Sequence, residues 1–132
     1  MNAPLYVDTS AAAKFILHET EGARLDSFLL DNQFTLVSSE LIEVELVRAV
    51  SRRSTKLNRL ARDVLRAIVL LPITSSVREA AGEIFPGKIK SLDAIHLSTA
   101  LEIKADLAGL LTYDNRMAEL ARESGIETLA PD

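Results

Sequence analysis

Three acidic residues, Asp8, Asp93 and Asp114, follow predicted strands or open a predicted helix, and a fourth, Glu45, lies about two turns into the predicted helix 40–53. Asp8 directly follows the apolar run 5–7, and Asp114 comes two residues after the apolar run 109–112. Carboxylates gathered at one edge of a sheet repel one another unless a cation neutralises them. Mg²⁺ and Mn²⁺ are hard cations that prefer carboxylate oxygens. The four acids therefore predict a divalent-metal site.

Each of these acids also has a structural explanation. Asp8 or Asp114 can cap the helix that follows it, and Asp93, in the first turn of a predicted helix, can complement the helix dipole. Glu45 alone is typical of an ordinary helix acid. A shared site is favoured only by the combination of the four. Helical periodicity does not choose between Glu43 and Glu45, because both have apolar residues beside them.

The sequence around these acids alternates short apolar runs with longer helical segments. This alternation is typical of a parallel sheet that is covered by helices on both faces. Ligands of such sheets bind beyond the carboxyl ends of the strands. We expect the serines at 38–39, 76 and 91 to cap helices. The predicted strands are 5–8, 34–37, 70–74, 109–112 and 126–129, and the predicted helices are 10–18, 21–30, 40–53, 57–70, 76–84, 92–104 and 115–124.

The length and composition of the chain are those of one ordinary domain. The chain has 132 residues without an internal repeat or a linker-like segment, so we expect a single domain over 1–132. It has no cysteine, which excludes disulfides, thiol catalysis and cysteine-bound metals. No apolar run approaches the roughly 20 residues of a membrane span, and the first residues lack a signal-peptide pattern. We therefore expect a cytoplasmic protein without a membrane segment.

Charge is unevenly distributed along the chain. The formal net charge is −4, which argues weakly against a protein that coats nucleic acid. Seven of the fifteen basic residues nevertheless lie between positions 48 and 66, with one acid, Asp63, among them. This segment is either a solvated helix surface or a stripe that faces phosphates.

Four sequence blocks resemble the PIN-domain family. The segment 7–10 (Val-Asp-Thr-Ser) resembles the opening block of these domains, and 38–49 resembles the second, in which the functional Glu precedes Leu. The third block resembles 91–100 and the fourth 111–116, and the closing segment 121–131 also fits. Within the family, the small size and the Ser-Leu-Asp-Ala-Ile-His sequence at 91–96 look most like the VapC-type toxins of bacterial toxin–antitoxin pairs.

The resemblance implies a three-layer α/β/α fold with a central parallel sheet of about five strands. It implies a Mg²⁺- or Mn²⁺-dependent endonuclease acting on RNA, usual homodimerisation, and inhibition by a small cognate antitoxin. It also selects Glu45 over Glu43, so the implied metal-binding and catalytic set is Asp8, Glu45, Asp93 and Asp114. Lys90 departs from the family, in which arginine often precedes the third block, and this change puts a phosphate or partner contact there in doubt.

For this activity we expect Asp8 and Asp93 to contribute most to the first metal, with Glu45 and Asp114 completing its surroundings directly or through water. One carboxylate could also orient the attacking water. Hydroxyl donors that orient these carboxylates, or simply cap helices, are expected to be Thr9, Ser39 and Thr112. Residues that contact RNA, or else the antitoxin, are expected among Arg48, Arg52, Lys56 and Arg59. We interpret His96 as structural, and Tyr6 and Tyr113 as packing residues.

Other protein classes also place an acid after the first strand. A phosphatase of the haloacid-dehalogenase type would have a second Asp two residues after Asp8, where this chain has Ser10. A receiver-like signalling domain would have an acidic pair in the first loop and a late lysine at a strand end, and neither is present. The remaining alternative is a PIN-like interaction module without catalysis, against which the presence of all four acids argues.

Overall fold

The computed structural model describes residues 2–17 and 20–131. Its centre is a five-stranded sheet in which every pair of neighbouring strands is parallel, in the order β3-β2-β1-β4-β5. This confirms the predicted parallel sheet of five strands. The strands are β1 (Pro4–Val7), β2 (Thr35–Ser39), β3 (Val69–Leu71), β4 (Gly109–Leu111) and β5 (Thr128–Leu129).

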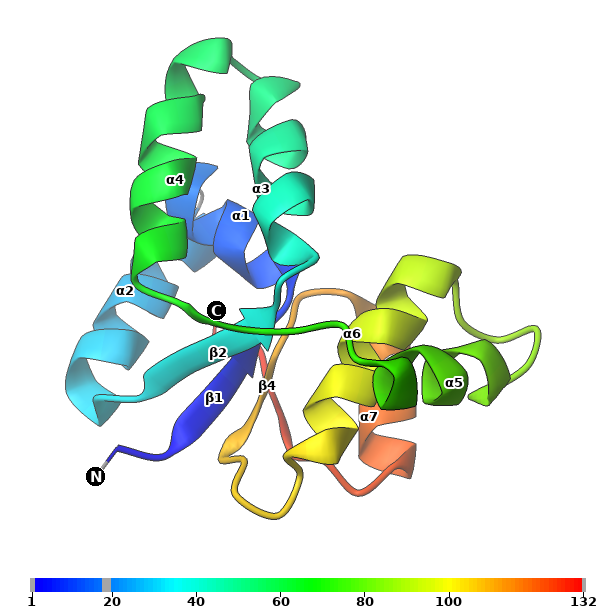
Figure 1. Ribbon diagram of the computed structural model, residues 1–132. Helices are drawn as coiled ribbons and strands as arrows, with labels where there is room; N and C mark the ends of the chain where they lie inside the picture. Colours follow the sequence, from blue (N-terminus) through cyan, green and yellow to red (C-terminus); the bar gives the residue numbers. More distant parts are fainter. Residues whose placement is uncertain (1, 18–19, 132) are drawn as a thin grey trace.

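Helices cover both faces of the sheet and complete the predicted α/β/α arrangement (Figure 1). One face carries α1 (Thr9–Leu17), α2 (Thr20–Asn32), α3 (Ile42–Ser51) and α4 (Asn58–Arg66), with the short 3₁₀ helix η1 (Thr55–Leu57) joining α3 to α4. The other face carries α5 (Ser75–Glu83), α6 (Ser91–Glu102) and α7 (Asn115–Glu123). Across the described ranges, no helix is both long and apolar enough to cross a membrane.

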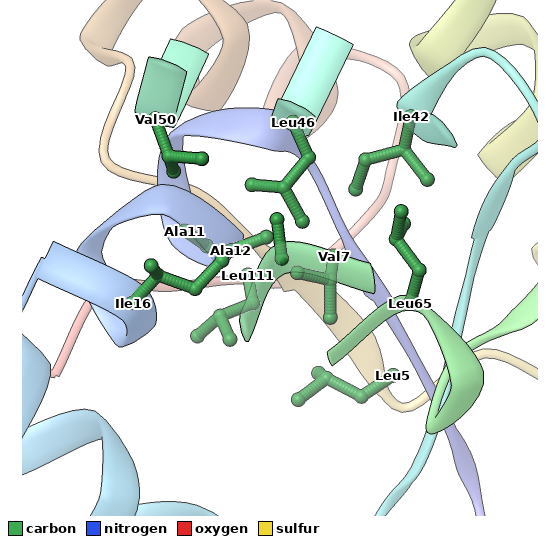
Figure 2. Packing of buried hydrophobic residues seen from close by; sticks show 11 residues of the cluster. Leu5, Val7, Ala11, Ala12, Ile16, Ile42, Leu46, Val50, Leu65 and Leu111 are labelled. Carbon is green, nitrogen blue, oxygen red and sulfur yellow. The ribbon is translucent and has the colours of Figure 1, made fainter. Parts of the chain in front are cut away.

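Alternation along the central strand divides the apolar core into two clusters. Leu5 and Val7 point to one face of the sheet and Tyr6 to the other, as the two-residue period of a strand requires. Figure 2 shows the first cluster, in which side chains of α1 and α3 pack over β1 and β4. Its labelled members are Leu5, Val7, Ala11, Ala12, Ile16, Ile42, Leu46, Val50, Leu65 and Leu111.

The connections change faces between β1 and β4. The chain leaves β1 for β2 and then β3 through helices on the first face, and it returns to β4 and then β5 through helices on the second. In register, Val7 lies beside Leu111, and the next residue, Asp8, donates its backbone N–H to the Leu111 carbonyl at 3.3 Å. Such a topological switch point is where open α/β sheets bind ligands.

Several predicted helix starts were wrong. Ser38 and Ser39 belong to β2, and α3 begins only at Ile42, so Glu45 lies in the first turn of α3 rather than two turns into a longer helix. The helix α5 is capped by Thr74, whose hydroxyl accepts from the Val77 N–H at 3.1 Å, and not by the predicted Ser76.

Two further boundaries also differ from the prediction. Ser91 is the first helical residue of α6 instead of its cap. The predicted helix 57–70 ends at Arg66, because Val69 begins β3. The predicted end of the first helix at position 18 lies outside the described residues.

Candidate active site

Asp8 is the most buried and most constrained of the four acids. Its side chain is 4 % exposed at the carboxyl end of β1. One oxygen, Oδ1, accepts from the Ser10 hydroxyl at 2.7 Å and from the Ala11 N–H at 3.1 Å, and Oδ2 accepts from the Thr112 hydroxyl. Burial raises the pKa of this carboxyl, although the three donors oppose that shift. An ionised Asp8 is therefore held rigidly in a place where its charge is poorly solvated.

Glu45 reaches the same region from the first turn of α3. Its Oε1 atom accepts from the Thr9 hydroxyl at 2.8 Å and lies 2.6 Å from His96 Nε2. Burial alone would raise the pKa of this half-buried carboxyl. The hydrogen bond and the charge of His96, together with the bond from Thr9, nevertheless bring the pKa below its ordinary value. Glu43, the alternative that periodicity left open, is exposed on α3.

Asp93 and Asp114 complete the group from the start of α6 and the end of β4. Partial burial, followed by the negative charge of Asp114, raises the pKa of Asp93. Asp8 and Glu45 raise the same pKa further, whereas His96 lowers it. Asp114 is the cap of α7, and its Oδ1 accepts from the Met117 N–H at 3.0 Å. The other three carboxylates thus lie within electrostatic range of Asp93.

The hydroxyl groups around the acids match the sequence predictions only in part. Thr9 and Thr112 donate to Glu45 and Asp8, as expected. Ser39 does not: within the described ranges its hydroxyl accepts from the Leu41 N–H and donates to none of the four acids. Sequence reasoning missed Ser10, whose hydroxyl donates to Asp8 and accepts from the Tyr113 N–H at 2.9 Å. Its position two residues after Asp8 was the available signal.

His96 and Tyr6 are buried beside the acids, and Tyr6 also belongs to the second apolar cluster. His96 is 1 % exposed, and its Nδ1 atom lies 2.7 Å from the Tyr6 hydroxyl. Burial raises the pKa of that phenol. Tyr6 therefore does more than pack, because its hydroxyl backs the imidazole that binds Glu45. Tyr113 points elsewhere and donates its hydroxyl to the Pro131 carbonyl at 2.5 Å.

The basic segment forms the helical hairpin α3–η1–α4, which projects from one side of the sheet (Figure 1). Arg48 lies one turn after Glu45 on α3, and Lys56 lies in η1 at the far turn of the hairpin. Arg52 and Arg59 lie near that turn, and all four predicted contact residues are exposed. Of these four basic residues, only Arg48 thus lies within one helical turn of an acid of the candidate site.

The donor set fits a hard divalent cation, because it consists of carboxylate oxygens. The raised pKa of Asp93 has mutual repulsion among these acids as one of its causes, and a cation would relieve that repulsion. Among the described residues, no three Asp, Glu or His side chains already stand close enough to hold one ion together. Waters would therefore complete the coordination, as is usual for Mg²⁺.

Comparison with protein families places this fold in a known class. The model of the PIN domain matches residues 5–123, which include all four acids and all or nearly all of strands β1 to β4. The fold agrees with a solved structure from Rickettsia felis, VapBC2 bound to a DNA fragment from its promoter. That likeness has a TM-score of 0.71 at 18 % identity, covering 98 % of this chain and 99 % of that one.

Curated relatives identify the group within this family to which the chain is similar in sequence. Ribonuclease VapC46 of Mycobacterium tuberculosis is 35 % identical over 129 residues, with 98 % of each chain covered. Ribonuclease VapC47 of the same species is 37 % identical over 131 residues, with 96 % of each chain covered. This chain therefore belongs to the PIN-domain family and, within it, to the VapC group.

Proposed function

We propose that this chain is an endoribonuclease that depends on Mg²⁺ or Mn²⁺ and serves as the toxin of a toxin–antitoxin pair. The observation that carries the proposal is the convergence of four carboxylates beyond the β1–β4 switch point, where three of them raise the pKa of the fourth. The naming of full-length relatives as ribonucleases supports RNA as the substrate.

In this proposal Asp8 and Asp93 provide most of the metal contacts, and Glu45 and Asp114 complete them directly or through water. A bound divalent ion supplies charge neutralisation at the phosphate and a more acidic water. Asp8 presents a preorganised charge, since three donors fix its carboxylate before any ligand arrives. Asp93 has the more exposed carboxyl and a raised pKa, so it is the better candidate to orient a water or exchange a proton.

The basic hairpin would hold the RNA strand, with Arg48 as the contact nearest to the acids. It is exposed one turn from Glu45, where a phosphate next to the scissile one could reach its guanidinium. Arg52, Lys56 and Arg59 would add sequence-independent attraction farther along the hairpin.

We further propose that the protein forms a homodimer and binds a small antitoxin. The Rickettsia felis structure is of VapBC2, which supports a partner protein here. A groove over α3 mixes apolar and charged side chains, and Val44 in it is 61 % exposed. A surface of this composition suits a protein partner. The groove is lined by Glu40, Leu41, Glu43, Val44, Val47, Arg48, Arg62 and Ile73.

The test is cleavage of a mixed RNA pool by the purified chain, freed of any partner, with Mg²⁺ or Mn²⁺ and with an EDTA control. Asp8→Asn should abolish discrete cleavage. Asp106→Asn should preserve it, because Asp106 is an exposed acid that precedes β4 and so lies at the opposite edge of the sheet.

Calorimetric titration with Mn²⁺ accompanies the cleavage assay. Binding that is lost in Asp8→Asn and kept in Asp106→Asn is the expected result. A chain that neither cleaves RNA nor binds Mn²⁺ would contradict the proposal and favour a PIN-like interaction module without catalysis.

A further inference from the structure

A continuous series of hydrogen bonds leads from the end of β2 to Glu45. The Ser39 N–H donates to the Tyr6 hydroxyl oxygen at 3.0 Å, that hydroxyl lies 2.7 Å from His96 Nδ1, and His96 Nε2 lies 2.6 Å from Glu45 Oε1. Tyr6 and His96 are both at most 1 % exposed. The series connects residues from β1, β2, α3 and α6, so its position is fixed by the whole fold.

The chemistry of the groups fixes the direction of the bond to Glu45. An ionised carboxylate only accepts hydrogen bonds, so the proton between Glu45 and His96 belongs to Nε2. The assignment holds for the neutral and the protonated imidazole alike, since Nδ1 can accept from the Tyr6 hydroxyl or donate to its oxygen. His96 is therefore a donor to Glu45 and not a free base.

Both donors to Glu45 bind the same oxygen atom. Thr9 and His96 each contact Oε1, at 2.8 Å and 2.6 Å. Within the described ranges, Oε2 accepts no hydrogen bond from the protein. The carboxylate is thus anchored through one oxygen, and the other remains available to a cation or to a water.

We infer that His96, backed by Tyr6, is a positioning residue that holds Glu45 by Oε1 and leaves Oε2 for the ligand. The inference rests on the proposed metal-dependent function. A glutamate side chain has three rotatable bonds, and fixing it in advance removes an ordering cost that ligand binding would otherwise bear. Ligand carboxylates in metal sites are commonly oriented in this way by hydrogen-bonding neighbours.

The test measures Mn²⁺ binding by calorimetry in the full chain, free of partner. His96→Leu removes the donor, and we expect affinity to fall about 10- to 100-fold. His96→Gln places an amide N–H near the position of Nε2 and should recover most of that loss. Ser98→Ala is the matched control, because Ser98 is a buried residue of α6 whose hydroxyl has no partner among the described residues. Ser98→Ala should bind Mn²⁺ as tightly as the unchanged chain does.

A double-substitution cycle adds the link to Glu45. If His96 acts through that carboxylate, His96→Leu should cause no further loss in a Glu45→Gln background. In the metal-free protein, the Nε2–H proton resonance of His96, identified by its absence in His96→Gln, should shift in Glu45→Gln. Circular dichroism and melting curves establish that each variant is folded.

The outcomes separate the two proposals. A folded His96→Leu variant that binds Mn²⁺ as tightly as the unchanged chain would overturn the positioning role and leave the proposed function intact. If the affinity losses of His96→Leu and Glu45→Gln add in the double variant, the positioning role is likewise overturned and the proposed function is left intact. Absence of Mn²⁺ binding by the unchanged chain would overturn both. Three results together would establish the positioning role: weaker Mn²⁺ binding in His96→Leu, recovered binding in His96→Gln, and no further loss of affinity in the double variant.

Discussion

Replacing Thr112 with valine isolates the contribution of one hydroxyl to the acidic site. Thr112 is 2 % exposed, and valine has nearly its shape, so the change removes the donor to Asp8 Oδ2 without opening a cavity. It also removes the acceptor of the Asp114 N–H, which lies 3.0 Å from the Thr112 hydroxyl oxygen. One substitution therefore loosens two of the four carboxylates.

The expected loss follows from these two bonds. A hydrogen bond to a charged group contributes about 1.5–3 kcal/mol, and an amide left without a partner costs about 1–3 kcal/mol when water cannot reach it. Asp114 is half-buried, which reduces the second cost. We expect Thr112→Val to lower the free energy of unfolding by roughly 2–4 kcal/mol and the melting temperature by about 10 °C. Mn²⁺ affinity should fall about 10- to 100-fold.

The assay is urea unfolding at pH 7.5 and at pH 4, with calorimetric titration of Mn²⁺ at the higher pH. Thr99→Val is the matched control, since Thr99 is 3 % exposed but donates to the Ile95 carbonyl of its own helix at 2.7 Å. That change should cost less than about 1 kcal/mol. The loss of stability in Thr112→Val should be smaller at pH 4, because burial raises the pKa of Asp8 and protonation of this carboxyl weakens its hydrogen bond to the hydroxyl. Equal losses in the two variants, or a loss independent of pH, would refute the reasoning.

Three further predictions follow from the charges and the backbone. The folded-state pKa values of Asp8 and Asp93 are raised, so their contribution to stability is complete below about pH 4 and is lost as pH rises through those values. Urea unfolding of the metal-free chain between pH 4 and 8 should show this decline, and a decline unchanged in Asp8→Asn would contradict it. Mn²⁺ at about 100 times its dissociation constant should add roughly 2.7 kcal/mol, measured as a higher melting temperature that Asp8→Asn abolishes. Gly125→Ala should cost about 1 kcal/mol or more, because φ is +85° and the added Cβ would meet a lysine amine at 2.6 Å. Gly82→Ala, in open space on α5, should instead stabilise the protein by about 0.5–1 kcal/mol. Thermal melts of the two variants measure both effects. Equal changes in melting temperature would contradict the backbone argument.

The fold could be predicted from the sequence because its signals are local and repeated. Short apolar runs that alternate with helical periodicity give the strands, the layers and the parallel direction. The helix starts could not be predicted as well, because a hydroxyl beside a helix has several possible partners. Ser39 illustrates this point: it ends β2, where its N–H donates to Tyr6 and its hydroxyl accepts from the Leu41 N–H. Thr74 caps α5, although Ser76 has the better local pattern.

The arrangement around the acids could be predicted less completely, for a related reason. Strand ends and a helix start pointed to Asp8, Asp93 and Asp114, whereas the family resemblance was needed to choose Glu45 over Glu43. The structure brings the other three carboxylates within electrostatic range of Asp93. Spacing did not show which donors hold them. The bond between His96 and Glu45 joins residues 51 positions apart, and that between Thr112 and Asp8 joins residues 104 positions apart. Only the packing of α6 on the sheet and the pairing of β1 with β4 create these contacts.

Capping and metal binding are alternative explanations of a strand-end acid in sequence, but a carboxylate has two oxygens and can do both. Asp114 Oδ1 accepts from the Met117 N–H and caps α7, and Glu45 Oε1 is occupied by two donors. In each case the second oxygen accepts no hydrogen bond within the described ranges. Asp8 differs, because both of its oxygens are bound by the protein. A cation at this site must therefore share the oxygens of Asp8 with hydroxyl donors, whereas Glu45 and Asp114 each offer an oxygen that is free of them. For Asp114, the bond that caps α7 thus also determines which carboxylate oxygen remains for a ligand.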